Sequence, residues 1–119
     1  DIFSRMKRRM GCFATVPNYK WCPYTPPLKP SKFGIMEPPL QNQIENTKLD
    51  ACLVPAIAVD KHGHRIGWGH GFFDQLLSNT IPHRIGIIFS DQLCSKTLPQ
   101  DNWDVPLTGV ITDKMERNF

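Results

Sequence analysis

The chain has 119 residues, of which 40% are hydrophobic, and it carries a formal net charge of +3 at pH 7. This length supports one domain with one modest core. The sequence contains neither the apolar run of about 18 residues that a membrane-spanning helix needs nor a recognisable signal peptide, so we expect no membrane span.

Residues 1–10 contain no Gly or Pro and consist mostly of good helix formers, which predicts a helix. Because the chain starts inside this helix and without a methionine, we expect a fragment, a processed product or part of a longer protein. The helix carries a basic stretch that consists of Arg5, Lys7, Arg8 and Arg9. Such a cluster is usually a solvated helix face, but it could also contact a protein or RNA partner.

The next segment is rich in proline. Residues 12–16 predict a short strand that ends at Pro17, and residues 17–39 hold seven of the eleven prolines. Proline removes a backbone donor and blocks helix, so we expect an extended or polyproline-like path here. Residues 40–48 are polar and predict a short helix or a mobile connection. Together these residues define a proline-rich extended segment over 17–48.

The second half of the chain predicts strands that alternate with a loop and a helix. The apolar run 49–59 predicts two strands broken at Pro55, followed by a turn at 61–63. A glycine loop and a short helix follow, and residues 84–89 predict the next strand. The last predicted strand lies within 104–112. This order predicts an α/β fold with a mixed, largely parallel sheet flanked by helices.

The cysteines are scattered and form no C-x-x-C pair that would indicate a zinc site. Cys52 and Cys94 lie in apolar runs, so we expect buried thiols and a reducing compartment, either the cytoplasm or the mitochondrial matrix. Three histidines near the glycine loop, His62, His64 and His70, could be a metal cluster. Polar residues of a hairpin turn and an anion loop are the favoured interpretation.

The segment from Asp60 to Asp74 reads DKHGHRIGWGHGFFD, with glycines at alternate positions. Alternating glycines let backbone N–H groups converge on one point, and such a concavity binds anions, above all phosphate. Arg65 stands before the loop and could offset phosphate charge, whereas Asp74 could hold a divalent metal. The spacing matches neither a Walker A loop nor a dinucleotide fingerprint, so a glycine-rich hairpin turn remains an alternative.

The run from Leu49 to Asp74 resembles the signature of the 5-formyltetrahydrofolate cyclo-ligase family, also called methenyltetrahydrofolate synthetases. The family signature ends in G-x-R-L-G-x-G-x-G-Y-Y-D, and this chain has GHRIGWGHGFFD. Other segments resemble the family in the same order: Ser31–Pro39, Arg84–Leu93 and Leu98–Asp113. The resemblance covers nearly the whole chain. It implies a single cyclo-ligase-like domain over 1–119 that corresponds to the C-terminal two-thirds of the family domain.

The resemblance implies ATP- and Mg²⁺-dependent ring closure of 5-formyltetrahydrofolate to 5,10-methenyltetrahydrofolate, a step of one-carbon metabolism. It assigns ATP binding to Arg65, Ile66, Gly67, Trp68, Gly69, His70, Gly71, Phe72 and Phe73, with Arg65 as the catalytic cation. It assigns folate binding to Trp68, Gly69, His70, Gly71, Phe72 and Phe33. Mg²⁺ would be held by Asp74 and Asp104.

Each assignment has a structural alternative. Asp104 could be a turn residue, Asp74 could only stabilise a helix dipole, and Arg65 could form an exposed ion pair with Asp60. The chain also departs from the family, because two phenylalanines replace its two tyrosines and the leading Lys and Arg are absent. The alternative function is therefore a catalytically weak or inactive relative that serves as an assembly subunit of a larger complex, possibly mitochondrial and RNA-containing.

Overall fold

The computed structural model describes residues 11–14, 20–24, 26–30, 34, 36–39, 42–67, 76–101 and 104–119, the first of these ranges by its backbone alone. The chain divides into two compact units, unit 1 (Asp1–Leu49) and unit 2 (Asp50–Phe119). The single domain over 1–119 stays a prediction. In the described part of the chain, no helix is long and apolar enough to cross a membrane.

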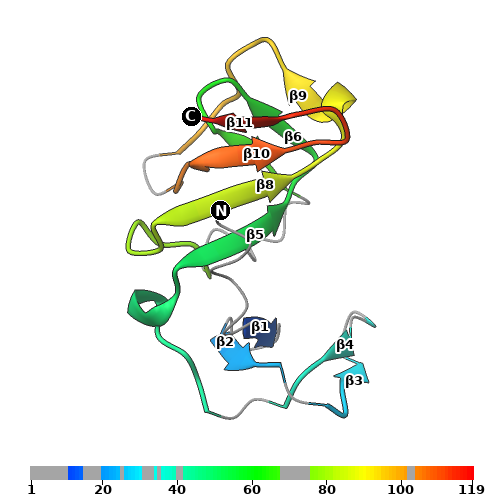
Figure 1. Ribbon diagram of the computed structural model, residues 1–119, viewed down its shortest axis with the longest axis vertical. Helices are drawn as coiled ribbons and strands as arrows, with labels where there is room; N and C mark the ends of the chain where they lie inside the picture. Colours follow the sequence, from blue (N-terminus) through cyan, green and yellow to red (C-terminus); the bar gives the residue numbers. More distant parts are fainter. Residues whose placement is uncertain are drawn as a thin grey trace. The chain divides into compact units, whose positions relative to one another are not determined.

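Unit 1 contains two small antiparallel sheets (Figure 1). Strand β1 (Gly11–Ala14) pairs with β2 (Lys20–Pro23), and β3 (Lys29–Pro30) pairs with β4 (Met36–Glu37). The backbone of Ile44 forms a bridge to β2, and the 3₁₀-helix η2 (Asn46–Lys48) follows. The side chains of Trp21 and Cys22 in β2 are buried.

The described part of the predicted proline-rich extended segment over 17–48 contains β2, β3 and β4, which are extended backbone paired into sheets that the sequence did not predict. Pro23 and Pro30 end two of these strands. Proline is tolerated in strands at edges and ends, where its missing N–H interrupts no ladder. The strand predicted at 12–16 is confirmed as β1, and the short helix predicted within 40–48 is confirmed as η2.

Unit 2 is built on a four-stranded sheet in the order β11-β10-β8-β5 (Figure 1). Strands β5 (Ala51–Pro55), β8 (His83–Ile87) and β10 (Gly109–Ile111) run parallel, and β11 (Glu116–Asn118) pairs antiparallel with β10. The predicted mixed sheet is thus confirmed. Its flanking helices stay a prediction, because 1–10 and 71–75 lie outside the described residues; residues 77–79 are described and are not helical, so the helix predicted to reach Asn79 does not extend that far.

Strand β11 was not predicted, since the last predicted strand ended at Thr112. All three residues of β11 are exposed and polar, so no apolar alternation signals a strand. The strand forms because its backbone completes the edge of the sheet beside β10. Just beyond it, the N–H of Phe119 donates to the carbonyl of Thr108 at 2.9 Å.

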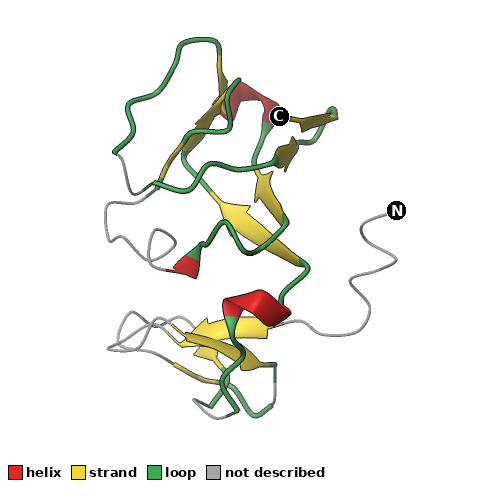
Figure 2. Cartoon of the chain, turned by 90° about the vertical axis from the view of Figure 1, so that its left-hand side faces the viewer, coloured by secondary structure: helices red, strands yellow, loops and turns green. Residues whose placement is uncertain are grey.

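A second sheet of unit 2 carries the hairpin that leads into the glycine loop. Its order is β7-β6-β9, in which β6 (Ala58–Asp60) pairs antiparallel with β7 (Arg65–Ile66) and parallel with β9 (Leu93–Cys94). The short 3₁₀-helix η3 (Ser90–Gln92) precedes β9; Figure 2 shows the helical turns of the described residues in red and the strands in yellow. The predicted strand break at Pro55 and the turn at 61–63 are both confirmed.

The core of unit 2 includes one face of the four-stranded sheet. Cys52 and Val54 of β5 are buried, whereas the alternate residue Leu53 is exposed, as the two-residue period of a strand requires. Gly86 makes room for this core, because a Cβ there would lie 2.8 Å from Cδ1 of Leu107.

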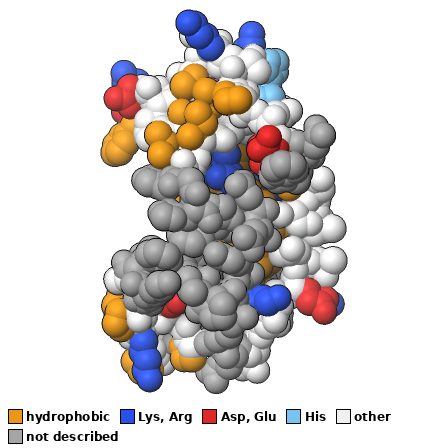
Figure 3. Space-filling model, turned by 180° about the vertical axis from the view of Figure 1, so that it is seen from behind, with side chains coloured by type: hydrophobic (Ala, Val, Ile, Leu, Met, Phe, Trp, Pro, Cys, Tyr) orange, Lys and Arg blue, Asp and Glu red, His pale blue; other side chains and the backbone are white. Residues whose placement is uncertain are grey.

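Figure 3 shows hydrophobic side chains also gathered on the surface of unit 2. Its exposed large hydrophobic residues are Leu53, Ile57, Ile66, Ile87, Phe89, Met115 and Phe119.

Candidate functional site

A small cleft in unit 2 brings together two of the residues predicted for the site. Its walls come from the β6–β7 hairpin and from the segment between β9 and β10, and they consist of His64, Arg65, Gln100, Asp104, Val105 and Pro106. A guanidinium and a carboxylate thus lie in one cleft. Such a pair suits a ligand that carries phosphate together with a divalent cation.

Asp104 has two roles in its local structure. Its backbone N–H donates to the carbonyl of Asp101 at 3.1 Å, and its Oδ2 accepts from the N–H of Asp101 at 2.7 Å. Asp104 is therefore a turn residue, as the structural alternative proposed. This turn fixes the carboxylate at the cleft, where it lies half-buried beside Val105. The role of Asp104 as a turn residue is therefore compatible with its predicted role as a metal ligand.

Arg65 lies where the glycine loop begins. A Cβ built on Gly67 would lie 3.1 Å from Nη1 of Arg65, so the absence of a side chain at Gly67 leaves room for the guanidinium. The charge of Arg65 also acts on Cys52: burial raises the pKa of the Cys52 thiol to about 12, and the charge of Arg65 opposes that rise. The predicted burial of Cys52 is confirmed, while Cys94 is only half-buried.

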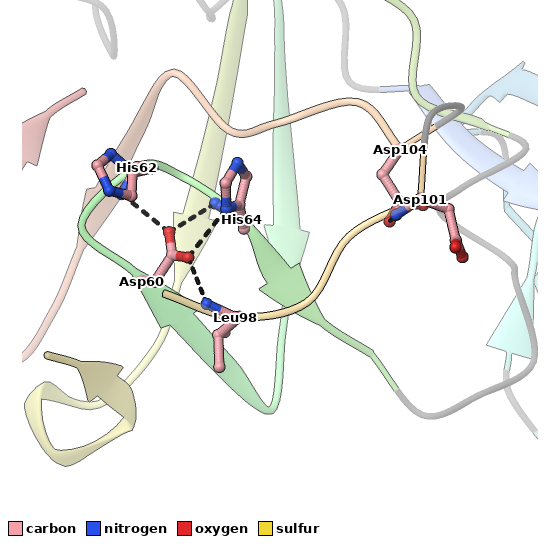
Figure 4. A network of polar contacts seen from close by, with 6 residues as sticks. All are labelled: Asp60, His62, His64, Leu98, Asp101 and Asp104. Carbon is pink, nitrogen blue, oxygen red and sulfur yellow. Dashed lines mark hydrogen bonds and ion pairs between the residues drawn. The ribbon is translucent and has the colours of Figure 1, made fainter. Parts of the chain in front are cut away.

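Asp60, which was considered as the ion-pair partner of Arg65, accepts hydrogen bonds from other groups (Figure 4). Its carboxylate is fully buried. Oδ1 accepts from the backbone N–H groups of His62 at 2.8 Å and His64 at 3.0 Å; Oδ2 accepts from the N–H of Leu98 at 2.7 Å and lies 3.0 Å from Nδ1 of His64. One carboxylate therefore ties the hairpin to the segment that leads to Asp104.

These hydrogen bonds decide the charge of Asp60. Burial alone would raise the pKa of its carboxyl group. The N–H groups of Leu98, His62 and His64, with the imidazole of His64, outweigh this effect and lower the pKa below its ordinary value. Asp60 is thus ionised at neutral pH. Sequence analysis missed this role, although an acid followed three residues later by Gly63 is a pattern typical of a side-chain-capped turn.

Gly63 closes the same turn by a contact that only glycine permits. Its φ is +85°, and a Cβ there would collide with the carbonyl oxygen of Leu107. The N–H of Gly63 donates to the carbonyl of Asp60 at 3.2 Å, and its own carbonyl accepts from the N–H of Leu107 at 2.8 Å. The hairpin is therefore attached to both ends of the 98–107 segment, so both walls of the cleft are held together.

Arg84 supports the cleft from inside the unit. Its buried guanidinium donates from Nε to the carbonyl of Pro106 at 2.7 Å and from Nη1 to the carbonyl of Ile81 at 2.8 Å. Its backbone N–H donates to Oγ1 of Thr108 at 2.8 Å. Burial lowers the pKa of the Arg84 guanidinium. Sequence analysis treated this residue only as a strand start, because a carbonyl partner distant in sequence leaves no local signal.

Most other predicted site residues lie outside the described residues, so their roles stay predictions: Phe33, Trp68, Gly69, His70, Gly71, Phe72, Phe73 and Asp74, together with Arg5, Lys7, Arg8 and Arg9. Ile66 is described, and its side chain is exposed at the end of β7. Among the described residues, no three His, Cys, Asp or Glu side chains converge as a metal site.

Comparison with known proteins identifies relatives of this chain. The model of the 5-formyltetrahydrofolate cyclo-ligase family matches residues 12–113. The 5-formyltetrahydrofolate cyclo-ligase of Haemophilus influenzae is 39% identical over 92 residues, which cover 71% of this chain and 48% of that protein. That of Mycolicibacterium smegmatis is 36% identical over 100 residues, which cover 80% of this chain and 51% of that protein. The chain thus spans about half the length of these curated relatives.

The solved structures agree with the sequence matches. The NMR structure of Aquifex aeolicus 5,10-methenyltetrahydrofolate synthetase superposes with a TM-score of 0.71 at 29% identity, covering 98% of this chain and 62% of that chain. A 5,10-methenyltetrahydrofolate synthetase from Mycoplasma pneumoniae gives a TM-score of 0.53 at 30% identity, covering 66% of this chain and 48% of that chain. On the match over residues 12–113, the chain belongs to the 5-formyltetrahydrofolate cyclo-ligase family.

Proposed function

We propose that the polypeptide that carries this chain is an ATP- and Mg²⁺-dependent 5-formyltetrahydrofolate cyclo-ligase. The observation that carries the proposal is the cleft in which Arg65, at the start of the glycine loop, lies with Asp104. A cation and a carboxylate placed beside an anion-binding loop are the groups that phosphoryl transfer requires. Family membership supports the choice of substrate.

The chemical difficulty of the reaction is that a formamide carbonyl is a poor electrophile. The formyl oxygen attacks the γ-phosphorus of ATP and ADP leaves, which converts that oxygen into part of a leaving group. N10 of the folate then adds to the formyl carbon and loses its proton, and inorganic phosphate departs with the original formyl oxygen. The protein has to align the γ-phosphate with the formyl oxygen and to offset the negative charge.

The described residues divide this work between the two walls of the cleft. Arg65 offsets charge on the transferred phosphoryl group, because a guanidinium binds phosphate oxygens through paired N–H donors. Asp104 offers carboxylate oxygens of the kind that Mg²⁺ prefers, and one of them is already oriented by the N–H of Asp101. Mg²⁺, when bound, neutralises phosphate charge. Asp74 would complete the metal ligands.

The undescribed residues complete the proposal as the family resemblance assigns them. The backbone from Gly67 to Gly71 would cradle the phosphates of ATP. The folate would contact Trp68, Gly69, His70, Gly71, Phe72 and Phe33. These assignments rest on matching positions in the family motif.

The metal role of Asp104 is tested by Asp104→Asn, with Asp101→Asn as the matched control. Asp101 is an exposed acid in the same turn and contributes its backbone N–H, which the control keeps. In titration calorimetry on the full-length protein, we expect Asp104→Asn to weaken Mg²⁺-dependent ATP binding by about 10-fold to 100-fold, the loss of one charge-assisted contact. ATP binding without Mg²⁺ should not weaken. Equal loss in both variants would refute the role of Asp104 as a metal ligand.

The place of Arg65 is tested by Gly67→Ala. The added methyl group would approach Nη1 of Arg65 at 3.1 Å, and the flexible end of that side chain would move aside. We expect little change in the free energy of unfolding but roughly 3-fold to 10-fold weaker ATP binding, since one charge-assisted contact is displaced. Chemical denaturation and calorimetry measure the two effects. Unchanged ATP affinity would show that Arg65 does not contact the nucleotide.

A further inference from the structure

Two charged side chains are buried among the described residues: Asp60 is 0% exposed and Arg84 is 8% exposed. Asp60 ends β6, Arg84 lies in β8, and neither side chain lines the cleft. Burying a charge is costly, and well-packed apolar residues in the place of buried charges often leave a protein equally stable. Stability alone therefore does not explain why charged residues occupy these two positions.

Both side chains bind the same stretch of backbone, the 98–106 segment. This segment forms one wall of the cleft and carries Asp104. Its described residues form neither helix nor strand, so the regular hydrogen bonds of those elements do not fix its course. The backbone groups of such a segment need other partners, and the two buried side chains supply them.

The two contacts lie on either side of Asp104 in the sequence. Before it, Oδ2 of Asp60 accepts from the N–H of Leu98 at 2.7 Å (Figure 4). After it, Nε of Arg84 donates to the carbonyl of Pro106 at 2.7 Å. A carboxylate satisfies a backbone donor and a guanidinium satisfies a backbone carbonyl, so the charge at each position matches the group that it binds.

Asp60 also connects this segment to the wall that carries the cation. Its Oδ1 accepts from the backbone N–H of His64 at 3.0 Å, and His64 directly precedes Arg65. Arg65 itself is held by the pairing of β7 with β6, in which it lies opposite Val59. Loss of the contact to the 98–106 segment would therefore displace the acid of the cleft more than its cation.

We propose, as an extension that rests on the function proposed above, that Asp60 and Arg84 are positioning residues for the metal: they hold the 98–106 segment so that the carboxylate of Asp104 meets Mg²⁺ while Arg65 meets phosphate. Neither of them touches the ligand. Mg²⁺ requires near-ideal octahedral geometry at short distances, so a small displacement of one carboxylate weakens its binding. Groups that orient a metal ligand typically contribute 10-fold to 100-fold to metal affinity.

The test uses Asp60→Asn and Arg84→Lys in the full-length protein, with Gln92→Leu as the matched control. Asparagine presents one oxygen instead of two, and lysine keeps the charge but lacks the planar fork of donors. Gln92 also binds backbone, since its Nε2 donates to the carbonyl of Ile57 at 3.0 Å, but it does not line the cleft. The control thus removes a contact of the same kind elsewhere in unit 2.

The measurement is calorimetric titration with ATP, in the presence and absence of Mg²⁺, below the melting temperature of every variant. We expect Asp60→Asn and Arg84→Lys to bind ATP about 10-fold more weakly than the wild type when Mg²⁺ is present. Without Mg²⁺ their affinity should match that of the wild type, and Gln92→Leu should match it in both conditions. A merely structural role would lower the melting temperature and the binding stoichiometry, but not the affinity for ATP with Mg²⁺.

The outcomes separate the two proposals. Should Asp60→Asn fold poorly, Arg84→Lys gives the measurement. Wild-type affinity for ATP with Mg²⁺ in the folded variants, or an equal loss with and without Mg²⁺, would overturn the positioning role and leave the proposed function intact. An equal loss in Gln92→Leu would do the same. Failure of the wild-type protein to bind ATP with Mg²⁺ would overturn both proposals.

Discussion

Asp60→Asn should destabilise the protein more than any other conservative change in the site, by about 2–5 kcal/mol, because two buried donors would face an amide NH₂ instead of an oxygen. Each carboxylate oxygen accepts from two groups on the 62–64 turn or at Leu98. Asparagine supplies only one such oxygen. The free energy of unfolding from urea denaturation measures this loss.

The pH dependence of stability provides a second measurement of the effect of Asp60→Asn. The pKa of Asp60 in the folded protein lies below its ordinary value of 3.8. The stabilisation is therefore fully present above that ordinary value and is lost as the pH falls through the lowered pKa. Asp60→Asn should lack this acid-dependent loss. The control is Asp113→Asn, an exposed acid that accepts from the N–H of Ser90 at 2.7 Å, which should change stability little. Equal unfolding free energies in Asp60→Asn and the wild type would contradict the network.

Arg65→Gln should reduce kcat/KM for ATP-dependent cyclo-ligation by roughly 100-fold, the usual cost of removing one donor that stabilises transition-state charge. Glutamine keeps a hydrogen-bonding amide but no charge. Arg65→Lys should retain part of the activity, because an ammonium keeps the charge without the paired donors. Steady-state kinetics on the full-length protein measure the effect.

Lys61→Gln is the control for Arg65→Gln. Lys61 is an exposed cation in the same hairpin turn and does not line the cleft. This variant should retain wild-type kinetics, which would exclude a general effect of charge in the hairpin. A kcat/KM for Arg65→Gln within twofold of the wild type would remove Arg65 from the mechanism.

The strands of unit 2 could be predicted because their sequence pattern and their burial agree. The break at Pro55 separates β5 from β6 as expected, and Gly63 occupies the turn with a positive φ. Strands β2 to β4 and strand β11 were not predicted, for two different reasons. Proline obscured the first group, and β11 is a polar edge strand that pairing with β10 stabilises. Pairing partners distant in sequence leave no mark on the segment itself.

The site could be predicted only in part. The position of Arg65 before the glycines follows from the sequence, but its meeting with Asp104 in one cleft came from family resemblance and not from spacing. The Asp60 network depends on backbone N–H groups, of which Leu98 is far along the chain. Every residue except proline carries the same backbone N–H donor, so the residue type does not indicate which donors will bind a carboxylate. Structure is needed to show which donors a buried carboxylate binds.

The most direct test of the account is an assay of the full-length polypeptide with 5-formyltetrahydrofolate, ATP and Mg²⁺, following 5,10-methenyltetrahydrofolate by its absorbance. We expect product that requires both ATP and Mg²⁺, forms with release of ADP and phosphate, and falls sharply in Arg65→Gln. No product from a folded full-length protein that binds ATP would contradict it. That result would favour the alternative of a catalytically inactive relative with a role in assembly.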